Sequence, residues 1–167
     1  NFQDHMFGVF LREAEHRGWP MQVHTGLARI HGSNPMLLAP GIEANPGVTF
    51  MLFHGGFPWI HETAGLAHTY ENAWVDINWL PIVSTNAAIH ALGIYLDVLP
   101  DARRISWGGD SWTSEESNGA LMAAKHMITQ WGASQVTQGL LDIDQVVTMG
   151  HRILGGNARR LFTFDAG

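Results

Sequence analysis

Short apolar runs alternate with amphipathic stretches along most of the chain. Residues 48–54 and 73–77 are nearly continuous apolar runs, which are typical of strands buried on both faces of a parallel sheet. In residues 2–17, apolar side chains recur every three or four positions, as on one face of a helix. The pattern predicts helices over 2–17, 36–44, 60–69, 85–99, 114–131 and 142–154, and strands over 20–24, 48–54, 73–77 and 104–107. Strands that alternate with helices in this way predict a parallel α/β sheet with crossover helices.

Turn and cap residues separate these predicted elements. Gly18 follows the first helix, and Asn34-Pro35 places an N-cap residue before a proline at the first helical position. Residues 45–47, Asn-Pro-Gly, separate the second helix from the next strand. Because we find no low-complexity segment and no linker, we predict a single domain over residues 1–167.

The composition narrows the class of protein. The chain has 167 residues, fewer than the roughly 250 of a complete (β/α)₈ barrel. Its net charge is −6 and its few basic residues form no stripe, so we expect no nucleic-acid partner. It has no Cys, which excludes disulfides and thiolate chemistry, and no apolar run of about 18 residues that would span a membrane. We expect a cytoplasmic protein.

Three of the predicted strands end in a polar residue next to a glycine-rich turn. The first ends at His24, the second at His54, and the fourth is followed by Gly-Gly and Asp110. In parallel sheets and barrels the active site lies at the carboxyl ends of the strands, so these side chains should share one mouth. Two imidazoles and a carboxylate suit zinc or another divalent ion. From the pattern alone, a shared metal or catalytic site and three ordinary loop residues are about equally favoured.

Several segments, in this order, resemble the amidohydrolase-related branch of the amidohydrolase superfamily. They are Val23-His24-Thr25-Gly26, Asn34-Pro35, residues 52–59, Glu62, residues 72–77, residues 105–110 and residues 153–162. The resemblance covers nearly the whole chain. It implies that the chain is the C-terminal half of a TIM-type barrel, with four parallel strands and outer helices that match barrel strands five to eight.

The resemblance also implies roles for the residues at the strand ends. His24 matches a metal ligand, and His54 matches a histidine that binds metal or polarises the substrate. Asp110 matches the aspartate that binds metal and takes a proton from the attacking water. The implied cofactor is a divalent metal ion, zinc first and manganese second. The implied reaction is hydrolysis of a C–N or C–O bond in a small polar substrate by a metal-activated water.

Two departures from the family pattern leave alternatives open. No His-x-His pair is present, although the family carries one on the first barrel strand, and Gly109 replaces the usual Ser before Asp110. One alternative is non-oxidative decarboxylation at the same site. Another, of a different class, is a non-catalytic barrel fragment that works by association. We expect the partner to be either a missing N-terminal half-barrel or a second copy of the chain, since half a barrel exposes two sheet edges.

Three further residues are candidates for substrate contact. Glu62 and Trp59 follow the second strand, and Asp76 ends the third. Each has an ordinary alternative: Glu62 suits the negative charge favoured at a helix N-terminus, Trp59 suits plain packing, and Asp76 suits a structural hydrogen bond.

Overall fold

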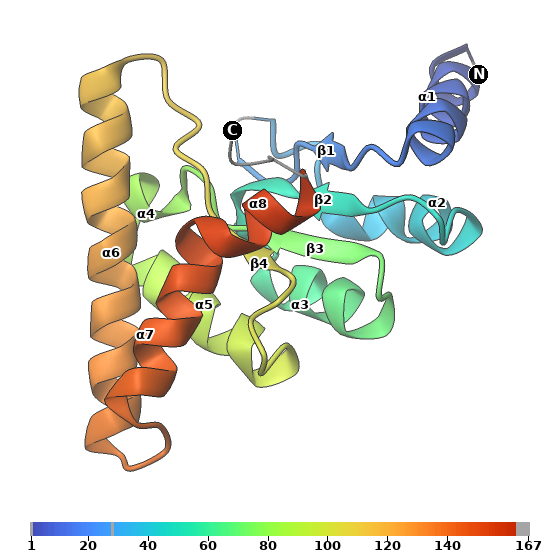
Figure 1. Ribbon diagram of the computed structural model, residues 1–167. Coiled ribbons are helices and arrows are strands. Elements are labelled where there is room, and N and C mark those ends of the chain that lie inside the picture. The colour runs from blue at the N-terminus through green and yellow to red at the C-terminus, as the bar shows by residue number, and fades with distance from the viewer. Residues whose placement is uncertain (1, 28, 163–167) are drawn as a thin grey trace.

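Four parallel strands form the centre of the molecule in the computed structural model, which describes residues 2–27 and 29–162 (Figure 1). The strands are β1 (Met21–Val23), β2 (Phe50–Leu52), β3 (Ala73–Asp76) and β4 (Ile105–Ser106), and they pair in chain order. The register aligns Leu52 of β2 with Val23 on one side and Val75 on the other. The predicted α/β class with four parallel strands is therefore confirmed.

Each strand is shorter than the apolar pattern predicted, and in β1 and β2 the histidine at the carboxyl end leaves the sheet. His24 lies beyond β1, and His54 lies in a short 3₁₀ turn, η2 (Phe53–Gly56), instead of in β2. Residues 48 and 49 also precede β2, although Val48 is buried.

The helices follow the predicted order with some changes in length. They are α1 (Phe2–Arg17), η1 (Pro35–Leu38), α2 (Ala39–Ala44), α3 (Ile60–Thr69), α4 (Leu80–Val83), α5 (Thr85–Val98), α6 (Ser114–Thr137), α7 (Ile143–His151), η3 (Arg152–Gly156) and α8 (Asn157–Leu161). The helix predicted over 36–44 is a 3₁₀ turn followed by α2, and Asn34 caps its start by accepting a bond from Met36 N at 2.9 Å.

Two predicted boundaries near the C-terminus are wrong. α6 continues beyond residue 131 to Thr137, because Gly132 lets α7 approach closely: a Cβ there would lie 2.2 Å from Val146 Cγ1. The helix predicted over 142–154 is α7 up to His151 and then a wide helical turn, η3, that leads into α8. Asn157, the first residue of α8, donates to Ala102 O and Ile105 O and so ties this helix to β4.

The buried core lies between the sheet and the helices and has two parts. One part joins β3 and β4 to α3, α5 and α6 and includes Val75, Leu92 and Met127. The other joins α1 and α2 to β2 and includes Leu11 and Phe50. Figure 1 shows α6 and α7 along one side of the molecule and α1 at the other. Within the described ranges, no helix is long and apolar enough to cross a membrane.

Candidate metal and catalytic site

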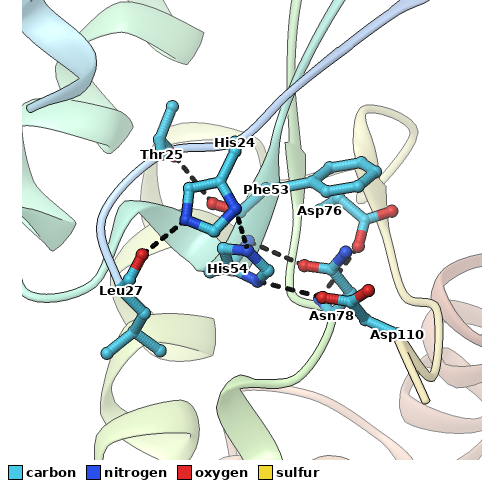
Figure 2. Close-up of polar contacts among 8 residues, drawn as sticks. All are labelled: His24, Thr25, Leu27, Phe53, His54, Asp76, Asn78 and Asp110. Atoms are coloured by element: carbon cyan, nitrogen blue, oxygen red, sulfur yellow. Dashed lines mark hydrogen bonds and ion pairs between the residues drawn. The ribbon is translucent and has the colours of Figure 1, made fainter. Parts of the chain in front are cut away.

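The three residues predicted from the strand ends lie together (Figure 2). His24 Nδ1 is 3.0 Å from His54 Nε2, and the two rings meet edge to face with centroids 4.4 Å apart. On the other edge of the His54 ring, Nδ1 is 3.8 Å from Asp110 Oδ2. His54 is buried, whereas His24 is exposed and Asp110 is 47 % exposed. The site is therefore a buried imidazole between two groups that solvent can reach.

The three side chains form a chain of contacts and do not surround a single point. The chain runs from Asp110 through His54 to His24, whose Nε2 contacts Leu27 O at 2.5 Å. Across residues 2–27 and 29–162, no group of three His, Asp or Glu side chains is arranged to hold a metal ion.

The donor atoms nevertheless fit a divalent ion in their chemistry. Two imidazole nitrogens bound to one tetrahedral zinc ion are about 3.3 Å apart. The observed separation of His24 Nδ1 and His54 Nε2, 3.0 Å, is close to that value. The spacing of these two nitrogens is therefore compatible with two ligands of one ion.

The pKa of His54 bears on its opposite edge, which faces Asp110. Burial, and secondly the neighbouring His24, lower the pKa of His54, while Asp110 acts in the opposite direction. Leu27 O can only accept, so in neutral His24 the Nε2 atom donates and Nδ1 accepts from His54. Neutral His54 then directs the lone pair of its buried Nδ1, which has no hydrogen-bond partner among the described residues, towards the Asp110 carboxylate. A cation near that edge would stabilise both groups.

The backbone at the strand ends adopts conformations that side chains rarely take. His54 has φ 61°, Asp110 has φ 47° and Trp79 has φ 59°. Such left-handed conformations cost energy in non-glycine residues and cluster at functional sites. His54 lies in the turn after β2, Trp79 lies three residues after β3 and Asp110 lies four residues after β4, so all three follow the carboxyl ends of strands.

Side chains from neighbouring elements hold the turn that carries His54. Thr25 Oγ1 donates to Phe53 O at 2.7 Å, and the His54 amide donates to Asn78 Oδ1 at 2.7 Å. The Tyr95 hydroxyl donates to Gly55 O. The conformation of residues 53–55 is therefore imposed by tertiary contacts in addition to the local sequence.

Asp76 is buried, unlike a carboxylate that is freely exposed to a substrate. Its Oδ2 accepts from Ser106 Oγ at 2.6 Å and its Oδ1 accepts from Asn78 N at 2.8 Å. Burial raises the pKa of Asp76, although these two bonds act against that rise. The contacts favour the structural hydrogen bond that was the alternative for this residue.

A cavity of about 340 Å³ adjoins Asp110. It is lined by Gln22, Met51, Phe53, Asp76, Asn78, Trp107, Gly108, Asp110, Ala158 and Phe162. Glu62 and Trp59 are not among the described residues that line this cavity. Glu62 instead borders a separate groove with Met36 and Tyr70, and Trp59 precedes α3, where its carbonyl accepts from Thr63.

Asn78 is the residue that sequence reasoning missed. It lies two positions after Asp76 and is 4 % exposed. The signal was present, because an Asp followed two residues later by Asn is typical of side chains that bond nearby backbone groups. The sequence does not show that His54, which follows the neighbouring strand β2, donates its backbone amide to the side chain of Asn78.

Parallel strands with outer helices and polar groups at their carboxyl ends define part of a barrel-type α/β enzyme fold. Comparison with known proteins identifies the family: the amidohydrolase profile matches residues 4–164, and the chain belongs to that family. It is 30 % identical over 152 residues to protein fluG of Emericella nidulans, covering 87 % of this chain and 18 % of that protein.

A solved structure shows the same fold. The crystal structure of a Lactobacillus casei protein provisionally classed as a metal-dependent hydrolase superposes with a TM-score of 0.80 at 22 % identity. The match covers 96 % of this chain and 43 % of the other. The four strands therefore correspond to part of a TIM-barrel-like structure, and the chain spans less than half of either protein.

Proposed function

We propose that this chain supplies part of the active site of a metal-dependent hydrolase that cleaves a C–N or C–O bond in a small polar substrate. The observation that supports it is the contact of His24 Nδ1 with His54 Nε2 at 3.0 Å, with Asp110 on the far edge of the same ring. The proposed ion is zinc, with manganese as the second choice, held by His24, His54 and Asp110.

Each residue has a role in this proposal. The bound ion would lower the pKa of a water molecule towards about 7 and so supply a nucleophile at neutral pH. Asp110, half exposed at the open edge, accepts a proton and passes it to the leaving group. His54 would bind the ion through Nε2, which leaves its proton on Nδ1, where it can stabilise the negative charge that develops on the substrate oxygen.

The cavity beside Asp110 is the proposed substrate pocket. Phe53 and Trp107 give it apolar walls, and Gln22 and Asn78 give it amide groups. Such a mixed lining suits a small substrate oriented by a few polar contacts. Decarboxylation at the same residues is the alternative reaction, and release of CO₂ from carboxylic-acid substrates would distinguish it from hydrolysis.

Metal content per chain tests the proposal first. We expect about one Zn²⁺ or Mn²⁺ per chain after equilibration and dialysis, measured by elemental analysis. Replacing a ligand, His24→Ala or Asp110→Ala, should weaken binding at least tenfold. His90→Ala is the matched control, because His90 and His61 form an exposed histidine pair with ring centroids 6.5 Å apart.

The opposite result would favour a non-catalytic domain that works by association. The observation in its favour is that no described group of three ligating side chains surrounds one point. Absence of bound metal, or equal loss in His90→Ala, would contradict the proposed metal site in this chain.

A further inference from the structure

We propose that Asn78 is a positioning residue of this site. It holds His54 in its left-handed conformation and so directs the imidazole towards both His24 and Asp110. The part of this inference that concerns metal binding rests on the proposed function; the part that concerns the geometry of His54 does not.

The contact that carries the proposal is made to the backbone of His54 itself. The His54 amide donates to Asn78 Oδ1 at 2.7 Å, and both residues are buried, with exposures of 1 % and 4 %. Breaking a bond of this length between buried groups would leave both groups without a partner, which costs free energy. Because His54 has φ 61°, rotation of its backbone towards ordinary values would break this bond and turn the ring.

Asn78 is itself held by Asp76, at the end of β3 (Figure 2). The backbone amide of Asn78 donates to Oδ1 of Asp76, the last residue of β3, at 2.8 Å. Asp76 Oδ2 accepts from Ser106 Oγ of β4 at 2.6 Å. A continuous hydrogen-bonded path thus runs from β4 through β3 to the residue after β2. Asp76 makes no described hydrogen bond to either histidine. Its buried carboxylate instead joins Ser106 to Asn78.

The other bonds to the same turn hold its neighbours. Thr25 bonds the carbonyl of Phe53, before the histidine, and Tyr95 bonds the carbonyl of Gly55, after it. These bonds fix the path of the chain into and out of the turn. The bond from Asn78 fixes the rotation at His54, on which the direction of the imidazole depends. Groups that orient a metal-binding side chain in this way change metal affinity by about 10- to 100-fold when they are removed.

The test compares Asn78→Ala with Asn157→Ala in the full chain. Asn157 is a matched control because it is also buried, at 3 % exposure, and its side chain also bonds backbone groups, away from the histidines. Imidazole ¹⁵N and ¹H signals of His24 and His54 are recorded without metal, and Zn²⁺ binding is measured by calorimetry. Urea unfolding shows that each variant is folded.

We expect Asn78→Ala to shift the imidazole signals of both histidines and to weaken Zn²⁺ binding at least tenfold. Asn157→Ala should leave those signals and the affinity within twofold of the unmodified chain, although it unfolds at lower urea. Unchanged imidazole signals in a folded Asn78→Ala variant, or equal changes in Asn157→Ala, would overturn the proposal.

Two provisions keep the outcome decisive. If Asn78→Ala does not fold, Asn78→Asp retains an acceptor for the His54 amide and should keep that amide protected from hydrogen exchange; loss of its protection would overturn the proposal. If the unmodified chain binds no Zn²⁺, the proposed function fails, and the imidazole signals alone decide the positioning role.

Discussion

Three of the four non-glycine residues with left-handed backbone conformations in the described part of the chain follow the carboxyl ends of strands. His54, Trp79 and Asp110 adopt them although none is a glycine, at a cost of about 1–3 kcal/mol each. Where the turn after His54 continues, glycine takes over: Gly55 and Gly56 have φ values of 54° and 63°. Glycine adopts these φ values without the steric cost that other residues meet, so it suits the two positions after His54.

Gly56 offers a direct test of this requirement. A Cβ at this position would lie 1.8 Å from Thr63 Oγ1, in addition to the unfavourable φ. We expect Gly56→Ala to lower the free energy of unfolding by about 2–4 kcal/mol, measured by urea denaturation. The control is Gly65→Ala within α3, where a Cβ meets nothing within 4 Å, and it should stabilise by up to about 1 kcal/mol. Equal effects of the two changes would contradict the argument.

Asp76 should make the stability of the protein depend on pH. Burial raises its pKa in the folded state above that in the unfolded chain, so the folded state binds the proton more tightly. The stability from this group is therefore present below the unfolded-state pKa of about 4 and is lost as the pH rises through the folded-state pKa.

Asp76→Asn removes this dependence and retains the acceptor for Asn78 N. The variant should gain in free energy of unfolding relative to the unmodified protein as the pH rises from about 4 to 7. Urea denaturation at several pH values measures the difference. Asp97→Asn, at an exposed position of α5, controls for the loss of one carboxylate. A difference that stays constant with pH would contradict the assignment.

At the scale of elements, Arg104 connects the end of a helix to the beginnings of two strands. Its Nη1 atom donates to Ala67 O, Tyr70 O and Ala73 O at 2.7, 2.9 and 3.0 Å. These carbonyls close α3 and lead into β3, while Arg104 itself precedes β4. One cation therefore bonds carbonyls from the end of a helix to the start of the next strand.

Arg104→Met should therefore destabilise the protein more than an ordinary surface change. We expect a loss of about 2–4 kcal/mol in the free energy of unfolding, because three carbonyls lose a charged donor. Arg103→Met is the control: this exposed side chain makes an ion pair with Asp101 at 3.5 Å, which contributes no more than about 1 kcal/mol. Similar losses in the two variants would show that the carbonyl contacts do not stabilise this junction.

At the scale of the whole molecule, the sheet has two edges. β1 and β4 each pair with one neighbour in the described part of the chain, and the chain covers 43 % of the Lactobacillus casei structure that shares its fold. Met21 N donates to Thr49 O, so the alternation along a strand directs Gln22 N towards the free edge of β1. Unpaired edges of this kind promote association.

Gln22→Pro tests whether that edge pairs with a second copy. Proline removes the outward donor and leaves the bonds from β1 to β2 in place. We expect the unmodified chain to associate as its concentration rises in sedimentation experiments, and the variant to do so at least tenfold more weakly. A chain that stays monomeric throughout would contradict pairing between copies at this edge.

The order and type of the main elements could be predicted from the sequence. Apolar runs such as the one around Leu52 and the breaker at residues 45–47 act locally, so they indicate strands and turns before any tertiary contact is known. The boundaries were less accurate. α6 runs past Gly132 because α7 packs there, which no local pattern shows.

The sequence by itself also indicated which polar residues at the strand ends lie together. A polar residue at the carboxyl end of a parallel strand must lie at the shared mouth of the sheet, and this rule placed His24, His54 and Asp110 together. Only the tertiary structure decided how they meet. They form a chain of contacts, and His54 donates its backbone amide to Asn78. Both features join residues that follow separate strands, and the order of residues along the chain does not determine the distances between them.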